Sequence, residues 1–215
     1  MENSRTNASR NSAGQALLRV VGEIHAQGWC QGTGGNFSVT LAHDPLEILV
    51  TQSGRDKRHL DLDDLVTVGR DGLPVAGETG KPSAETLVHA SIVAATGAGS
   101  TLHTHSIPAT LLSEHYLPEG GFTITGYEML KGLEGIRTHR ARVFVPILPN
   151  AQDMHRFSGE VDTLLAEKPE IHGFLIAGHG LYTWGASLEQ AQRQVEIFEF
   201  LFECVARRTH FRPLA

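Results

Sequence analysis

Three histidines in this sequence have the residue type and spacing of a metal site. His103 and His105 are separated by one residue in a strand-like run, and side chains at i and i+2 of a strand project from the same face. His179 lies between Gly178 and Gly180, whose missing side chains allow a close approach of backbone and imidazole. Three neutral nitrogen ligands with one open position are typical of catalytic zinc. The spacing therefore predicts one zinc ion on these histidines, against the alternative that His103 and His105 merely lie on a half-exposed strand.

The remaining nine histidines lack this spacing, and we interpret them as surface or packing residues. They are His25, His43, His59, His89, His115, His139, His155, His172 and His210. Imidazole ligands also accept iron, cobalt, nickel or manganese, so the sequence does not fix the physiological metal.

Three short segments carry backbone N–H groups together with small polar side chains, which is the composition of an anion-binding site. Their candidate ligands are Asn36, Ser53, Gly54 and Ser83. Ser83 also precedes an expected helix, whose start it can cap and whose N-terminus favours a phosphate group. Ordinary turns and helix caps use the same residues, and the neighbouring metal site is what favours an anion. Local positive charge can come from Arg55, Lys57, Arg58 and Lys81.

Two carboxylates are candidates for proton transfer. Glu85 lies near the start of the expected helix, where a negative charge is favourable without any catalytic role. Glu128 lies in a segment flanked by Gly126 and Gly132, where a solvated surface carboxylate is the alternative. A proton shuttle works best with a pKa near neutrality, so we expect partial burial to help Glu128 in such a role.

The elements that must position these side chains follow from periodicity and from helix and strand end signals. We predict helices at residues 15–27, 84–96, 107–115 and 188–208, and strands at 37–41, 47–54, 100–106, 141–148 and 172–185. The last helix has an apolar stripe that includes Ala191, Val195 and Phe198. Strands and helices mix without a regular βαβ alternation, which favours an α/β sandwich with much antiparallel pairing.

Length and composition limit the possible classes of protein. The chain has 215 residues and 40% hydrophobic content, which predicts a single domain at 15–215 after a disordered, polar tail at 1–14. A net charge of −6 argues against binding to nucleic acid or to an anionic membrane. Cys30 and Cys204 lie far apart, as in a reducing compartment. With no signal-peptide core and no long apolar run, we expect a cytoplasmic location.

The segments GTGGNFSV, TQSGRDK, KPSAET, HTHS and AGHGLYTWG, taken in order, resemble the class II aldolase and epimerase family over about residues 15–208. The resemblance implies a class II aldolase-like three-layer sandwich, in which helices flank a central, largely antiparallel sheet. It also implies a sugar-phosphate substrate, one zinc ion per subunit, and a homotetramer with active sites near subunit boundaries. By position, His103, His105 and His179 would bind zinc. The phosphate would be surrounded by Asn36, Ser53, Gly54 and Ser83.

Within that family, the stretch from ITGYEMLKGL through VPILPN and the final EIFEFLFECVAR resemble members that dehydrate a sugar phosphate. This resemblance implies that Glu128 is the acid/base. Glu85 stands where the aldolases carry their catalytic glutamate and where some dehydratases have a cysteine, so its role is open.

Two rival functions remain. A fuculose-phosphate-type aldolase or a pentulose-phosphate epimerase would share the metal and phosphate sites. A non-catalytic scaffold on the same fold is the alternative from another class of protein. A zinc peptidase is disfavoured because the sequence contains no HExxH segment.

Overall fold

The computed structural model of the chain describes residues 2–208, with side chains from residue 8 onward. Its centre is one sheet, whose strands are β1 (Asn36–His43), β2 (Leu46–Thr51), β3 (Leu65–Val68), β4 (Ser100–Thr104), β5 (Gly121–Ile124), β6 (Val143–Leu148), β7 (Gly173–Ile176) and β8 (Gly180–Gly185). The eight strands lie in the order β3-β2-β1-β4-β8-β7-β6-β5. Neighbouring strands pair antiparallel, except β6 and β7, which run parallel. The predicted largely antiparallel sheet is therefore confirmed.

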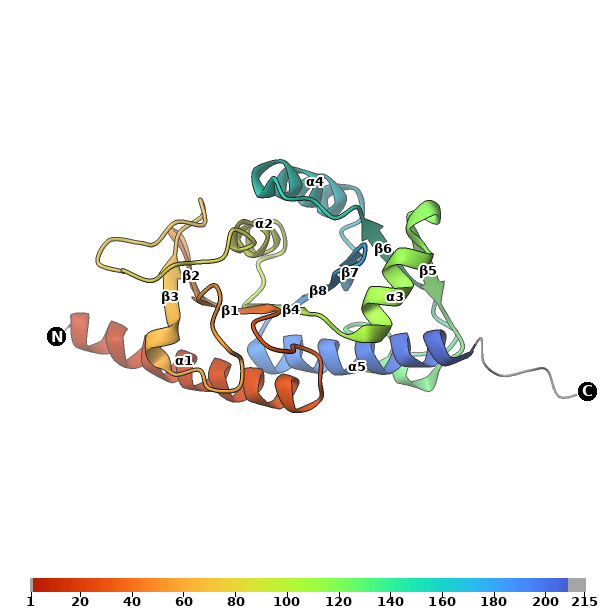
Figure 1. Cartoon of the computed structure of the whole chain (residues 1–215), viewed down its shortest axis with the longest axis horizontal. Helices are drawn as coiled ribbons and strands as arrows, with labels where there is room; N and C mark the ends of the chain where they lie inside the picture. The colour runs from red at the N-terminus through yellow and green to blue at the C-terminus, as the bar shows by residue number, and fades with distance from the viewer. Residues whose placement is uncertain (1, 209–215) are drawn as a thin grey trace, which may run out of the picture.

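Helices cover both faces of this sheet. They are α1 (Glu2–Ala26), α2 (Thr86–Thr96), α3 (Ile107–His115), α4 (Met154–Glu167) and α5 (Leu188–Arg208), with short 3-10 helices η1 (Leu62–Asp64), η2 (Leu117–Glu119) and η3 (Glu128–Gly132). In Figure 1, α2 and α4 lie on one face while α1 and α5 run along the other. This is the three-layer α/β sandwich expected from the sequence.

Each layer contact is a cluster of buried apolar side chains. On the α2 and α4 face, Ile92 and Phe157 pack with Tyr182 of the sheet. On the opposite face, Phe198 and Phe202 of α5 are buried with strands β5 to β8. Each such side chain contributes about 1.5–3 kcal/mol when fully buried. Because buried residues recur every three or four positions along α5, the predicted apolar stripe of this helix is confirmed.

Helix α1 differs from the disordered tail predicted for residues 1–14, because it begins at Glu2. Arg10 donates from Nε to Thr67 Oγ1 at 3.2 Å and from Nη2 to Glu78 at 2.9 Å. Gly14 lies so close to Leu62 that an added Cβ would come within 2.7 Å of that side chain. Contacts with distant segments therefore extend a helix whose own sequence is polar, and local composition carries no sign of them. Met1, His210 and the other residues beyond Arg208 lie outside the described part of the chain.

Three elements are absent from the sequence prediction: β3, β5 and α4. Each of the two strands has only four residues, too few for a clear period-2 pattern. Helix α4 did leave a signal, since Asp153 accepts from Arg156 N at 3.1 Å as a cap and Phe157 and Val161 follow at helical spacing. Within the described residues, no helix combines the length and apolar character needed to cross a bilayer.

Candidate metal and anion site

The three predicted histidines meet at one point of the sheet. His103 Nε2 lies 2.8 Å from His105 Nε2 and 3.3 Å from His179 Nε2. The ligand atoms of all three lie within 4.8 Å of one another. The antiparallel register places His103 opposite Asn36 on β1 and opposite Tyr182 on β8, so these side chains share a face. The predicted convergence of the imidazoles is confirmed.

His179 lies in a tight turn between β7 and β8, and this turn places its side chain in the cluster. Gly178 has a φ of 62°, in the left-handed region that side chains disfavour. At Gly180, an added Cβ would come within 1.9 Å of Thr104 O, so another residue cannot fit against β4. The two glycines thus have the role predicted for them, which is to let His179 reach β4 closely.

The histidines suit a divalent cation. His103 Nδ1 lies 2.8 Å from the carbonyl oxygen of Leu181, which can only accept, so Nδ1 carries the proton and Nε2 offers a lone pair to the cluster. Burial lowers the pKa of His103 well below its ordinary value and that of His105 to about 4. Neutral imidazoles with converging ring nitrogens are the ligands that a transition metal requires.

Tyr182 supports the cluster from below and was not singled out in the sequence. Its fully buried ring stacks on His103 with centroids 4.0 Å apart and planes 12° from parallel. Such a contact fixes the plane of the imidazole and therefore the direction of its lone pair.

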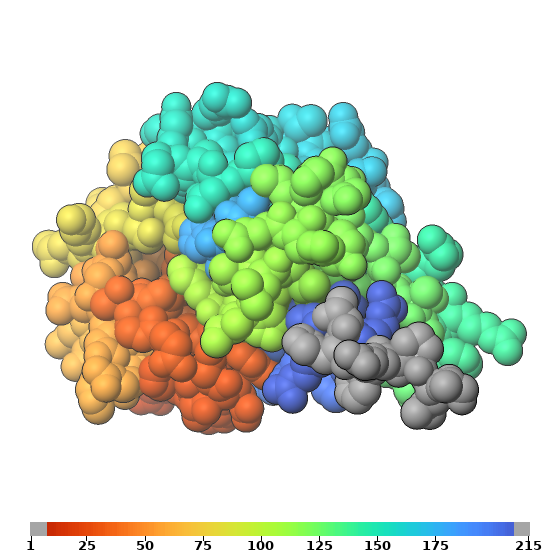
Figure 2. All heavy atoms as spheres, turned by 45° about the vertical axis from the view of Figure 1, so that its right-hand side comes forward, coloured from red at the N-terminus to blue at the C-terminus, as the bar shows by residue number. Residues whose placement is uncertain are grey.

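The three anion-binding segments meet beside the histidines. They line a cavity of about 250 Å³ that contains Asn36, Ser53, Gly54 and Ser83, together with His105. Figure 2 shows blue atoms of the β7–β8 segment, which carries His179, between α3, in green, and α4, in teal. The sequence thus identified loops that come together in space, although they are far apart in the chain.

Ser83 does not cap α2 as predicted. The N-cap residue is Glu85, whose side chain makes no cap hydrogen bond, and the helix begins at Thr86. Ser83 Oγ accepts instead from Glu85 N at 3.3 Å, within the preceding turn. The turn between Ser83 and Thr86 displaces the helix start, and the Ser83 hydroxyl lines the cavity.

Lys57 supplies the positive charge of the cavity. Of the four cations considered from the sequence, only Lys57 lines it. Its side chain is buried, and Nζ donates to the carbonyl oxygens of Thr33 at 3.1 Å and Arg55 at 2.9 Å. Desolvation lowers the pKa of this ammonium group. A buried cation held by neutral carbonyls retains charge for an anion in the cavity.

Glu85 lies between the anion-binding loops and the histidines. Its Oε2 accepts from Asn36 Nδ2 at 2.5 Å, and its Oε1 lies 3.4 Å from His179 Nε2. The carboxylate also lines the cavity. Glu85 is therefore close enough to contact both a bound metal and a bound substrate.

Glu128 lies elsewhere, on η3, which packs against α5. Its side chain is 69% exposed, forms an ion pair with Lys131 and lies 3.7 Å from His139 Nδ1. It is not among the described residues that line the cavity beside His105. The hydrogen bond from Lys131 is the main cause that lowers the pKa of Glu128. A single chain therefore does not provide the partial burial expected for this carboxylate.

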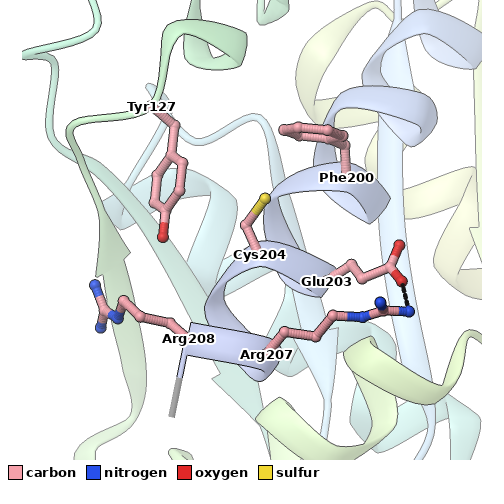
Figure 3. A pocket seen from close by; sticks show the side chains of 6 residues that line it. All are labelled: Tyr127, Phe200, Glu203, Cys204, Arg207 and Arg208. Atoms are coloured by element: carbon pink, nitrogen blue, oxygen red, sulfur yellow. Dashed lines mark ion pairs between the residues drawn. The ribbon is translucent and has the colours of Figure 1, made fainter. Parts of the chain in front are cut away.

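A second, larger cavity lies near the end of α5. It measures about 470 Å³ and is lined by Tyr127, Phe200, Glu203, Cys204, Arg207 and Arg208. Figure 3 shows the Cys204 thiol between the two aromatic rings, and an ion pair between Glu203 and Arg207. Burial raises the pKa of Cys204, which disfavours the reactive thiolate. The described residues that line this cavity include neither the three histidines nor Glu85 nor the candidate anion-binding segments, so the candidate site lies at the smaller cavity.

His89 is the clearest residue that the sequence interpretation missed. It was assigned to the surface or to packing, yet it is fully buried, with Nε2 hydrogen-bonded to Asn36 Oδ1 and Nδ1 2.7 Å from Ser38 Oγ. A signal existed, because Glu85 and His89 are four residues apart and so lie on one face of a helix. Nothing in the sequence placed that face over Asn36.

Comparisons with known proteins agree with this geometry. Residues 15–206 match the sequence model of a family described as "Class II Aldolase and Adducin N-terminal domain". A methylthioribulose-1-phosphate dehydratase of Sorangium cellulosum (strain So ce56) is 40% identical over 198 residues, which cover 92% of each chain. The protein of that name from Pseudomonas paraeruginosa (strain DSM 24068 / PA7) is 43% identical over 92% of this chain and 95% of its own. Among solved structures, an L-fuculose-1-phosphate aldolase of Thermus thermophilus superposes with a TM-score of 0.72 at 23% identity, over 99% of each chain.

Proposed function

Because this chain belongs to the class II aldolase and adducin family, we propose that it is a zinc-dependent lyase that dehydrates 5-methylthioribulose 1-phosphate. The product would be 2,3-diketo-5-methylthiopentyl 1-phosphate, a step of methionine salvage. The observation that carries the proposal is the convergence of three imidazoles beside a polar cavity with a buried cation. The similarity to dehydratases over nine-tenths of the chain supports this choice of substrate.

The phosphate group of the substrate would occupy the loops at one end of the cavity. Asn36, Ser53, Gly54 and Ser83 offer amide, hydroxyl and backbone N–H donors there, and Lys57 adds a full positive charge. Hydrogen bonds between charged partners are about twice as strong as neutral ones. Binding at this end directs the sugar carbons of the substrate toward the histidines.

His103, His105 and His179 would hold the metal at the other end. When bound, a divalent ion supplies Lewis-acid stabilisation of negative charge on the substrate oxygens. The three imidazoles are neutral and only the nearby carboxylate of Glu85 would offset the charge of the ion, which favours an electron-rich substrate group.

Dehydration requires two proton transfers. A base removes the proton from C3, and an acid protonates the C4 hydroxyl as it leaves as water; the resulting enol becomes the second ketone. One carboxyl group can perform both transfers by holding the proton between them. We assign this work to Glu128.

Glu128 is paired with Lys131 and His139 at the surface and is not among the described residues that line the cavity of its own chain. The proposal therefore includes a homotetramer in which Glu128 of one subunit completes the site of its neighbour. Closed cyclic symmetry would repeat the same contact at every subunit boundary. The proposal also includes a cytoplasmic location, where a reducing environment keeps Cys30 and Cys204 as the free thiols seen here.

The test is to incubate zinc-loaded protein separately with 5-methylthioribulose 1-phosphate and with fuculose 1-phosphate, and to identify the products by mass. We expect loss of one water molecule from the first substrate and no reaction of the second. Cleavage of either substrate into two smaller carbonyl compounds would reject the dehydratase assignment.

A class II aldolase is the second candidate, and the position of Glu85 favours it. Glu85 lies in the cavity at 3.4 Å from His179, whereas Glu128 does not. The same product analysis separates the two activities. A scaffold function would require no metal. Stoichiometric zinc in the purified protein would therefore argue against it.

A further inference from the structure

Four polar side chains, three of them buried, form a continuous series of hydrogen bonds that ends at the cavity. Ser38 and Asn36 come from one face of β1, and His89 and Glu85 come from α2 and its N-terminal cap. The contacts are Ser38 Oγ to His89 Nδ1 at 2.7 Å, His89 Nε2 to Asn36 Oδ1, and Asn36 Nδ2 to Glu85 Oε2 at 2.5 Å. Ser38 and His89 are fully buried, and Asn36 is 5% exposed.

The directions of the hydrogen bonds between these four side chains follow from Glu85, which lies at the cavity. The Glu85 carboxylate can only accept, so Asn36 must present its NH₂ group to it and its carbonyl oxygen to His89. His89 must then carry a proton on Nε2. Because burial lowers the pKa of His89 to about 3, the ring is neutral and its Nδ1 accepts from the Ser38 hydroxyl.

Packing alone does not require a histidine at this position. The buried neighbours Val88 and Ile92 on the same helix are apolar. A buried imidazole is unfavourable unless its nitrogens are hydrogen-bonded, and both nitrogens of His89 have partners. The imidazole thus supplies the N–H donor that pairs with the carbonyl oxygen of Asn36 while the NH₂ group of Asn36 faces Glu85.

We propose that His89 is a positioning residue, which fixes the Asn36 amide and, through it, the carboxylate of Glu85 in the cavity. The inference rests on the proposed function, because it assumes that this cavity binds the substrate. Without the N–H of His89, Asn36 Oδ1 would be buried without a donor, and the amide could turn its oxygen toward Glu85. Two oxygens would then face each other and displace the carboxylate.

A pair of substitutions at this position separates positioning from packing. His89→Met fills a similar volume without a donor, whereas His89→Gln places an amide N–H near the position of Nε2. We expect His89→Met to lower kcat by about 10- to 100-fold, the range for groups that orient the residues of a metal site. His89→Gln should recover most of this loss, and both variants should keep the wild-type zinc content. Ile92→Val is the matched control, because it shortens a buried side chain of the same helix without touching the polar chain.

Equal losses in His89→Met and His89→Gln, or an unchanged kcat in a folded His89→Met, would overturn the proposal. A second measurement does not depend on turnover or on the variants folding: long-range ¹H–¹⁵N NMR of the wild-type protein reports the tautomer of each histidine. We expect His89 as the neutral ring protonated on Nε2, and a ring protonated on Nδ1 would also overturn the inference. If the wild type fails to dehydrate the substrate while His89 shows the expected tautomer, the proposed function fails and the hydrogen-bond chain stands.

Discussion

The two candidate acid/base carboxylates lie in opposite surroundings. Glu85 is one-fifth exposed, accepts a hydrogen bond from a buried amide and lies beside His179. Glu128 is 69% exposed and paired with two basic side chains at the surface. The fold of one chain determines the environment of Glu85, whereas the environment of Glu128 is still mostly solvent.

This difference shows which parts of the candidate site one chain provides and which it does not. The candidate metal ligands, the candidate anion-binding segments and Glu85 all converge within a single subunit. A general acid/base must lie within hydrogen-bond reach of the substrate, so a catalytic Glu128 implies a second copy. The following predictions test the two regions separately, beginning with the largest expected effect.

His103→Ala should remove the metal and with it the activity. His103 is the central ligand, since its Nε2 faces both other imidazoles. Loss of a ligand should exceed the roughly 10- to 100-fold effects seen when only a supporting partner is removed. Zinc is measured by mass spectrometry of the purified protein beside turnover. His155→Ala, at an exposed histidine, is the control, and near-stoichiometric zinc in His103→Ala would refute the ligand assignment.

Glu128→Gln should reduce turnover by about 10²- to 10⁴-fold, the usual contribution of a general acid/base. Zinc content should not change, because Glu128 lies far from the ligand set in its own chain. Turnover and zinc are measured on the same preparation. Retained activity would remove Glu128 from the mechanism and leave Glu85 as the candidate.

Mixing the two inactive variants tests whether Glu128 serves its own subunit or a neighbouring subunit. If Glu128 serves a neighbouring subunit, co-assembled His103→Ala and Glu128→Gln chains rebuild some intact sites, about a quarter of them under random assembly in a closed ring. If both residues serve the same chain, no site is rebuilt and the mixture stays inactive. The assay is turnover after joint refolding, with each variant refolded alone as the control.

Lys57→Met should weaken binding of the phosphate group. A hydrogen bond to a charged group contributes about 1.5–3 kcal/mol, so we expect KM to rise by about tenfold or more. The constant for inhibition by inorganic phosphate should rise in parallel, while kcat changes less. Lys81→Met, at an exposed lysine near the cavity loops, is the control. An unchanged KM in folded Lys57→Met would show that the backbone donors bind the phosphate unaided.

The last prediction concerns stability and no effect on turnover, at the opposite face of the histidine-bearing strand, where the buried Glu199 accepts from Thr104 Oγ1 at 2.7 Å. Burial raises the pKa of Glu199 from 4.5 to about 7. Between these values the folded state binds more protons than the unfolded state, so the free energy of unfolding falls as pH rises. Glu199→Gln cannot titrate and should be more stable than the wild type by about 3 kcal/mol at pH 8.

Urea unfolding of the metal-free protein at pH 4.5 and pH 8 measures this difference. The two proteins should be nearly equal at the lower pH, and the gap should open as pH rises. Glu196→Gln, at an exposed position of the same helix, should show no such gap. A gap of the same size at both pH values would assign the effect to packing.

Patterns among residues close in sequence predicted the elements with a regular period and the turns marked by glycines. The period of two predicted that His103 and His105 point the same way, and their rings do converge although β4 ends at Thr104; the helical period identified the buried stripe of α5. Glycines marked the turn that carries His179. Such signals are visible in sequence because they depend on neighbours within a few residues.

Long-range contacts decided what the sequence could not predict. In helix α1, Arg10 donates to Glu78, 68 residues away, a contact that no pattern within the helix sequence indicates. His89 is hydrogen-bonded to Asn36, 53 residues away in the sequence, because α2 lies over β1. The side chains of these residues are ordinary in type, and only the packing of elements distinguishes them from their neighbours.

The sequence by itself determined which residues can bind a metal and an anion, because those capacities belong to side-chain chemistry and short spacing. The tertiary structure decided which of them meet, since the distance between Glu85 and His179 depends on how α2 packs on the sheet that contains β8. It also left Glu128 at the surface, a result that no local pattern contains, because exposure is a property of the whole folded chain.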